Sequence, residues 1–187
     1  MIVAMATILL ALGSNLGDRA ENLARARGLL ADSLTLLDSS PIYETEPWGV
    51  TDQPDFLNQA LLAECDLTPE ALLALVKEIE ARMGRDFAAV RYGQRVIDID
   101  ILAYDDLLVD SPRLTIPHQR LAERAFVLMP LNDIAPDWEH PGLHLTVAQM
   151  LAQVDASGVE RWQEDARSQT PSNPIEHPTN TSQRATL

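Results

Sequence analysis

Apolar positions follow two different periods along the chain. An almost continuous apolar run at 4–12 predicts a buried strand, and apolar residues at helical spacing predict a helix over 19–31 that Asp18 caps. The β-compatible stretch 34–45 follows, with Pro41 marking an edge or a bulge. The first quarter of the chain therefore predicts a strand, a helix and a second extended segment.

The middle of the chain repeats this pattern. After a predicted loop at 46–55 come a strand at 56–67, a helix from Thr68-Pro69 to Gly84, a second long loop at 84–95 and a strand at 96–103. A short hairpin through Val109 and helices at 120–131 and 146–154 follow. The order β-α-β-β-α-β predicts an α+β, ferredoxin-like fold, in which helices pack on an antiparallel sheet, with C-terminal helical additions.

The composition changes near residue 163. Residues 168–187 are rich in proline and small polar residues and have almost no large apolar side chains. Such a segment buries too little surface to offset the loss of chain entropy. We therefore expect a catalytic domain at 1–162 and a disordered polar tail at 163–187.

Charge and cysteine content narrow the function classes. The chain of 187 residues has a net charge of −14, which disfavours nucleic-acid binding because the surface repels phosphates at long range. A single cysteine, Cys65, excludes an internal disulfide. The apolar run at 1–12 is too short to span a bilayer and lacks a basic start and a cleavage site. We expect a cytoplasmic monomer that binds neither membranes nor nucleic acids.

The segment Val96–Leu102 carries the first candidate chemistry. In a strand, Ile97, Ile99 and Ile101 face one side, whereas Asp98 and Asp100 share the other with Cα atoms roughly 6.5–7 Å apart. Neighbouring carboxylates repel unless a cation lies between them, and such hard oxygen ligands suit Mg²⁺. A solvated strand face is the alternative interpretation.

Basic residues gather immediately before these aspartates. The sequence places Arg82, Arg85, Arg91 and Arg95 within fourteen residues. Arginine suits phosphate oxygens, and cations beside a metal-binding carboxylate pair form a clamp for a polyphosphate. Surface arginines in a solvated loop would explain the cluster alone, but its position before the aspartates favours phosphoryl-type transfer.

At this point the residues resemble a known family, the 6-hydroxymethyl-7,8-dihydropterin pyrophosphokinases of folate biosynthesis. The resemblance runs from about Ala6 to about Leu151 and rests on several motifs in order. These are Ala11–Asp18, Tyr43–Thr45, Gln53–Asn58, Ile79-Glu80 with Gly84-Arg85, Arg91–Leu102, Leu114–His118 and Arg124–Leu131. The resemblance implies transfer of pyrophosphate from ATP to the hydroxymethyl group of the pterin, with release of AMP.

The resemblance also implies a role for each matching residue. Two Mg²⁺ ions would bind Asp98 and Asp100, and the catalytic set would add Arg85 and Arg95. ATP would contact Glu80, Arg85, Arg91, Arg95, His118 and Arg124. The pterin would stack between Phe56 and Phe126, with Thr45 and Asn58 at its polar edge and Tyr92 beside it. Catalysis would depend on positioning and electrostatics, without a covalent enzyme intermediate.

Three other interpretations remain open from the sequence. The aspartates alone allow another two-metal nucleotide transferase. Departures from the family pattern at Phe87, Gln94 and Gln119 allow a weakened pterin- or nucleotide-binding protein. A nucleic-acid-binding module of the same fold is contradicted by the charge.

Overall fold

The fold is an antiparallel sheet with helices on both faces. The structure is a computed structural model, and it describes residues 5–47, 52–85 and 93–163. The strands are β1 (Ala6–Ser14), β2 (Thr35–Ser39), β3 (Tyr43–Thr45), β4 (Phe56–Cys65), β5 (Asp98–Tyr104), β6 (Val109–Asp110), β7 (Thr115–Ile116) and β8 (Val159–Arg161). The helices are α1 (Arg19–Ala31), α2 (Pro69–Arg82), the 3₁₀ turn η1 (Leu121–Glu123), α3 (Ala125–Ile134) and α4 (Val147–Leu151).

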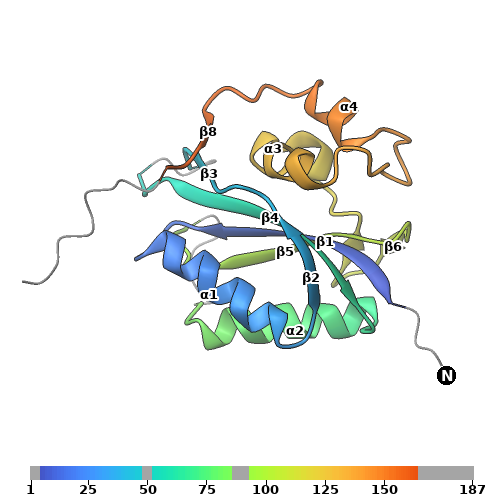
Figure 1. Cartoon of the computed structure of the whole chain (residues 1–187), viewed down its shortest axis with the longest axis horizontal. Coiled ribbons are helices and arrows are strands. Elements are labelled where there is room, and N and C mark those ends of the chain that lie inside the picture. Colours follow the sequence, from blue (N-terminus) through green and yellow to red (C-terminus); the bar gives the residue numbers. More distant parts are fainter. Residues whose placement is uncertain (1–4, 48–51, 86–92, 164–187) are drawn as a thin grey trace, which may run out of the picture.

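The sheet has the order expected of a ferredoxin-like core. Its strands are arranged β5-β1-β4-β3-β8, β2 also pairs with β4, and these pairings are antiparallel. Helices α1 and α2 cover one face, whereas α3 and α4 lie over the other (Figure 1). The prediction of an α+β sheet with C-terminal helical additions is therefore confirmed.

Alternation along the strands divides the core into two layers. In β1, Ile8, Leu10 and Leu12 pack toward α1 and α2, whereas Leu9 packs toward α3 and α4. Burying both faces explains why the run from Ala6 to Leu12 is almost continuously apolar. None of the helices in the described part of the chain is long and apolar enough to cross a membrane.

Local signals fix the two helices of the ferredoxin-like core. The side chain of Asp18 accepts a hydrogen bond from the backbone N–H of Glu21, and Thr68 caps α2 in the same way at Ala71. Helix α2 ends at Arg82, and Gly84, two residues later, adopts a φ of 90° that favours glycine. The predicted span 19–31 for the first helix is confirmed.

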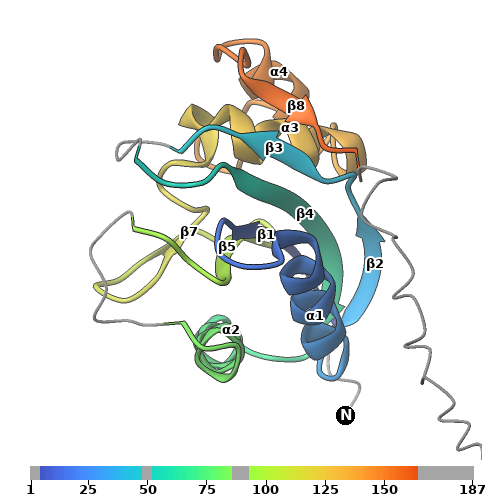
Figure 2. The ribbon, with the colours of Figure 1, turned by 90° about the vertical axis from the view of Figure 1, so that its left-hand side faces the viewer.

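Four predicted boundaries are wrong. The hairpin expected through Val109 begins at that residue instead, with β6 and β7 as its strands. The helix expected at 120–131 is split, because the chain forms η1 and becomes extended at Arg124 before α3 begins. The last helix is only Val147–Leu151, and the fourth strand begins at Asp98. The prediction also lacked the strand β8 (Figure 2). Of the predicted tail at 163–187, residues 164–187 lie outside the described residues.

Candidate active site

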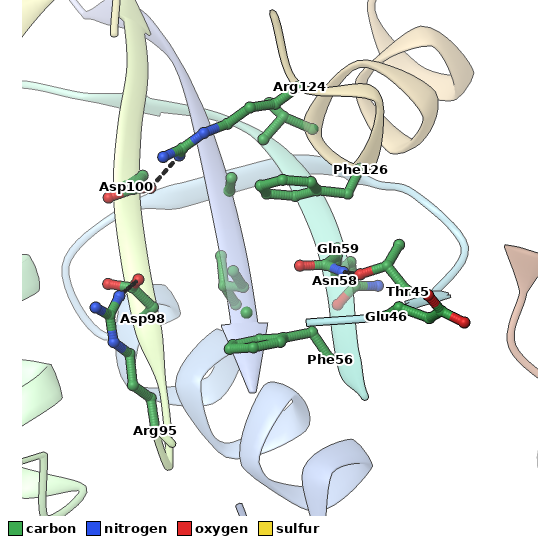
Figure 3. A pocket seen from close by; sticks show the side chains of 14 residues that line it. Thr45, Glu46, Phe56, Asn58, Gln59, Arg95, Asp98, Asp100, Arg124 and Phe126 are labelled. Carbon is green, nitrogen blue, oxygen red and sulfur yellow. Dashed lines mark hydrogen bonds and ion pairs between the residues drawn. The ribbon is translucent and has the colours of Figure 1, made fainter. Parts of the chain in front are cut away.

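A cavity of about 120 Å³ opens on the face of the sheet that carries α3 (Figure 3). It lies where β1, β4 and β5 meet the beginning of α3. Its lining consists of Ala11, Leu12, Gly13, Thr45, Glu46, Phe56, Asn58, Gln59, Arg95, Asp98, Asp100, Arg124, Phe126 and Val127. We call it the aromatic cavity, and it contains eight of the site residues expected from the sequence.

Two aromatic rings form opposite walls of this cavity. Phe56 begins β4 and Phe126 lies in the first turn of α3, and Figure 3 shows their rings on opposite sides of the space. The guanidinium of Arg124 lies 5.5 Å from the centre of the Phe126 ring. The arrangement suits a flat ring system inserted between two aromatic faces.

A polar edge lies between the two rings. The amide nitrogen of Asn58 donates a hydrogen bond of 2.9 Å to the hydroxyl oxygen of Thr45, and both residues are buried. Gly13 lies opposite Asn58 in the β1–β4 pairing, and a Cβ at this glycine would lie 3.4 Å from the Asn58 Oδ1. Any larger side chain at Gly13 would therefore extend into the polar edge.

The aspartate pair, Asp98 and Asp100, lines the side of the cavity formed by β5. The intervening Ile99 points into the opposite core layer, as predicted from the alternation. The Asp98 and Asp100 side chains remain 21% and 33% exposed, so a cation in solution could reach both. The predicted shared face is confirmed.

Charges around the two carboxylates differ. Burial raises the pKa of Asp98, but the guanidinium groups of Arg85 and Arg95 outweigh it and hold that pKa below its ordinary value. Arg85 contacts the Asp98 Oδ1 at 2.6 Å, and Arg95 forms an ion pair with the other oxygen. Burial and the charge of Asp98 raise the pKa of Asp100, whose ion-pair partner Arg124 is 3.8 Å away.

A buried carboxylate supports this arrangement from behind. Glu80 on α2 is fully buried and forms ion pairs with Arg85 and with Lys77, the latter at 2.9 Å. Its Oε1 also accepts a 2.8 Å hydrogen bond from the backbone N–H of Ile99, the residue between the two aspartates. These partners lower the pKa of Glu80, but burial outweighs them and raises that pKa above its ordinary value. Glu80 thus fixes both Arg85 and the strand that carries the aspartate pair.

A second cavity, of about 290 Å³, adjoins the first at Asp100, which lines both. We call it the adjoining cavity; its lining is Leu73, Lys77, Ile99, Asp100, Ile101, Ser111, Pro112, Arg113, Leu114, Thr115, His118 and Gln119. Burial lowers the pKa of His118, although Asp100 opposes this shift. The His118 Nδ1 accepts a 3.2 Å hydrogen bond from the backbone N–H of Arg120, so Nε2 carries the proton of the neutral ring.

Asn15 connects the two segments that flank the aromatic cavity. Its amide nitrogen donates 3.1 Å hydrogen bonds to the Gln53 side chain and to the Pro54 carbonyl. Its Oδ1 accepts from the backbone N–H of Arg95 at 2.7 Å. The side chain therefore connects the end of the segment before β4 with the end of the segment before β5.

The structure brings most of the expected residues together. Glu80 and Arg85 lie directly behind the aspartate pair and His118 lies in the adjoining cavity, whereas Arg91, Tyr92 and Phe87 lie outside the described residues. Arg82 is not part of the cluster: its side chain is 56% exposed, and it lies 4.0 Å from Glu78 on the same helix. Gln94 is exposed and Gln119 lines the adjoining cavity.

Sequence reasoning missed Lys77, Arg113, Gln59 and the connecting role of Asn15. Lys77 precedes Glu80 by three residues on α2, a spacing that could have suggested their contact. The other three depend on contacts between segments far apart in the chain, which local patterns do not reveal.

Comparisons with known proteins agree on one family. Residues 9–136 match the family model described as 7,8-dihydro-6-hydroxymethylpterin-pyrophosphokinase (HPPK). A 2-amino-4-hydroxy-6-hydroxymethyldihydropteridine pyrophosphokinase of Methylorubrum extorquens is 48% identical over 154 residues, which cover 81% of this chain and 96% of that protein. One of the same name from Aquifex aeolicus is 40% identical and is covered to 85%.

A solved structure agrees with the fold. The HPPK-DHPS of Plasmodium falciparum, solved with pteroate, has a TM-score of 0.65 and 18% sequence identity to this chain. The match covers 80% of this chain but only 42% of the solved one. At this identity the likeness supports the arrangement of strands and helices alone.

Proposed function

Because the chain belongs to the 7,8-dihydro-6-hydroxymethylpterin-pyrophosphokinase family, it transfers pyrophosphate from ATP to 6-hydroxymethyl-7,8-dihydropterin in folate synthesis, and we propose that the two adjoining cavities hold these two substrates. One observation carries this assignment: Asp100 lines both cavities, and Asp98 lies beside it. The transferred group would thus pass the aspartate pair on its way from one substrate to the other.

The pterin occupies the aromatic cavity in this proposal. Its flat ring stacks between Phe56 and Phe126, and its polar edge bonds to Thr45 and Asn58. Tyr92 would add an aromatic surface from the segment before β5, a contact that lies outside the described residues. The hydroxymethyl group then points toward the aspartate pair.

ATP occupies the adjoining cavity, with its phosphates directed to the aspartate pair. Its cationic lining, which includes Lys77 and Arg113, suits an anionic ligand, and neutral His118 offers an N–H donor. Arg124 and Arg91 would hold the nucleotide as well, and Glu80 supports the site by orienting Arg85.

The aspartate pair has the donor chemistry of a Mg²⁺ site. Among the residues that the structure describes, no group of three or more His, Cys, Asp or Glu side chains is arranged to hold a metal ion, so the protein would offer two carboxylates. Mg²⁺ is commonly held in this way, by one or two carboxylates, substrate phosphates and water. We propose two Mg²⁺ ions, which would supply charge neutralisation on the phosphates when bound.

The residues of the chain then act through placement and charge. The cavity walls hold the pterin hydroxyl in line with the β-phosphorus, where the new O–P bond forms as the bond to the departing AMP breaks. Arg85 and Arg95 stabilise the charge that develops on the phosphoryl oxygens, because Asp98 already directs both guanidinium groups toward the aspartate pair. The hydroxyl proton leaves to solvent. The reaction thus requires no covalent enzyme intermediate.

The same proposal includes a cytoplasmic monomer. The single free and buried thiol of Cys65 is compatible with a reducing compartment.

An AMP-release assay tests the function. The full chain is incubated with ATP, Mg²⁺ and 6-hydroxymethyl-7,8-dihydropterin, and parallel reactions omit the pterin or the metal ion. AMP formation that requires both is expected. Binding of ATP by the folded chain without AMP formation would contradict the proposal and favour a weakened binding protein.

A further inference from the structure

The C-terminal strand β8 is attached to the rest of the fold by three side chains that the proposed roles do not use. The Tyr43 hydroxyl on β3 donates a 2.6 Å hydrogen bond to Asp133 on α3. Arg161 on β8 donates a 3.2 Å hydrogen bond to the Tyr43 hydroxyl and lies 3.0 Å from the other oxygen of Asp133. We call this triad the clasp. It joins β3, α3 and β8, which lie side by side in Figure 2.

The clasp lies on the same faces as the pterin-binding residues. Tyr43 and Thr45 are two residues apart on β3, so their side chains share one face of the sheet. Asp133 and Phe126 are seven residues apart on α3, about two helical turns, so they share one side of the helix. The contact between Tyr43 and Asp133 therefore joins β3 to α3. The same two elements carry Thr45 and Phe126, which line the aromatic cavity.

A third cavity lies between the segment that leads into β8 and the pterin-binding residues Thr45 and Phe126. It measures about 230 Å³, and Thr45, Glu46, Arg124 and Phe126 belong to both its lining and that of the aromatic cavity. Its remaining walls include Asp155 and the stretch 157–159, which leads into β8. This segment lies beyond residues 9–136, to which the family match extends. The part of the chain outside the match thus forms a wall behind the aromatic cavity.

We propose that Tyr43 and Arg161 are positioning residues for the pterin. Through Asp133 they hold α3 at a fixed place on β3, and this sets the separation between Phe126 and Thr45. Neither side chain lines the aromatic cavity, so the effect is transmitted through the helix and the strand. The inference rests on the proposed location of the pterin. It predicts that loss of the clasp weakens the binding of the pterin but not the binding of ATP.

Steady-state kinetics of the full chain test the proposal. Tyr43→Phe removes only the hydroxyl, and Arg161→Met removes a side chain that is 60% exposed, so its loss leaves the core unchanged. Each is expected to raise the KM for the pterin by about three- to tenfold, which is the size of one or two partly exposed polar contacts. The kcat and the KM for ATP stay within about twofold of the unaltered chain. The double variant resembles the stronger single variant, because both act through one triad.

Two further variants sharpen the test. Arg161→Lys retains a cation for Asp133 and is expected to restore part of the pterin affinity. Arg25→Met removes an exposed arginine from α1, on the other face of the sheet, and is expected to change neither KM.

The outcomes separate this inference from the proposed function. Unchanged pterin KM in folded Arg161→Met and Tyr43→Phe chains would overturn it, even if their melting temperatures fall. An equal loss of affinity for both substrates would also overturn it. Equilibrium binding of the pterin, followed by its fluorescence, needs no turnover. A chain that binds the pterin but releases no AMP would therefore contradict the transfer reaction while still deciding the role of the clasp.

Discussion

Replacing Asn15 by alanine is expected to destabilise the chain and to slow the reaction together. Asn15 is about 1% exposed, and its carboxamide makes three hydrogen bonds, two as donor and one as acceptor. At about 0.5–1.5 kcal/mol for each bond, their loss lowers the free energy of unfolding by about 2–4 kcal/mol. For a domain of this size, each kcal/mol lowers the melting temperature by about 2–4 °C, so we expect a decrease of about 5–15 °C.

The effect on catalysis follows from the position of Arg95. Asn15→Ala removes one of the two hydrogen bonds between these residues: the Asn15 Oδ1 accepts from the Arg95 N–H at 2.7 Å, whereas the 3.0 Å bond from the Asn15 backbone N–H to the Arg95 carbonyl remains. A displaced guanidinium would no longer face the phosphates, and displacements of about 1 Å can reduce turnover by about a hundredfold. We expect Asn15→Ala to lower kcat by roughly ten- to a hundredfold, measured as AMP release at saturating ATP and pterin.

A neighbouring asparagine provides the matched control. Asn22 donates hydrogen bonds to the Ser14 hydroxyl and to the Leu16 carbonyl, but it contacts neither segment flanking the aromatic cavity. Asn22→Ala is expected to lower the melting temperature by a few degrees with kcat unchanged. The reasoning is refuted if Asn15→Ala melts and reacts like Asn22→Ala.

Five further variants test the site and the domain boundary. Replacing either member of the aspartate pair by alanine is expected to reduce turnover at least tenfold, and a smaller loss in a Mg²⁺ titration would contradict the metal site. Arg95→Ala is expected to lower kcat more than it raises the pterin KM; an unchanged kcat would remove its proposed task. Gly13→Val is expected to weaken pterin binding by at least about tenfold in a folded chain, because the methyl groups of valine press on Asn58. An unchanged dissociation constant for the pterin in titration calorimetry would exclude this crowding. Deleting residues 164–187 is expected to leave the melting temperature and the activity nearly unchanged, and a large loss of either would show that the tail contributes to the fold.

The elements that the sequence predicted well are those with strong local signals. Helix α1 has both a capping aspartate and three buried residues at helical spacing, and β1 has an apolar run that both core layers require. Strand β8 has neither signal, since it is three residues long and mostly exposed. It is a strand because β3 pairs with it, and this pairing joins residues more than a hundred positions apart. Such tertiary context is what β-propensity alone does not contain.

The site residues also differ in how far local sequence patterns could predict them. Alternation alone placed the aspartate pair on the face opposite Ile99, because the geometry of a strand leaves no other choice. The roles of Phe56, Phe126 and Asn58 came only from the family resemblance, since an isolated phenylalanine in a pattern indicates core. The clasp and the connection through Asn15 could not be predicted, because each depends on three segments that meet only in the folded chain.

The balance of charge within the site bears on whether ATP binds free or together with divalent cations. Lys77, Arg85, Arg95 and Arg124 face Glu80, Asp98 and Asp100, so the cluster carries one more cation than carboxylates although the whole chain is strongly acidic. That small excess cannot neutralise a polyphosphate, whose approach the acidic surface also opposes. Burial, with the charge of Asp98 added to it, raises the pKa of Asp100. A nucleotide that arrives with divalent cations would leave the cluster close to neutral, and this favours the proposed metal-bound ATP over free ATP as the donor.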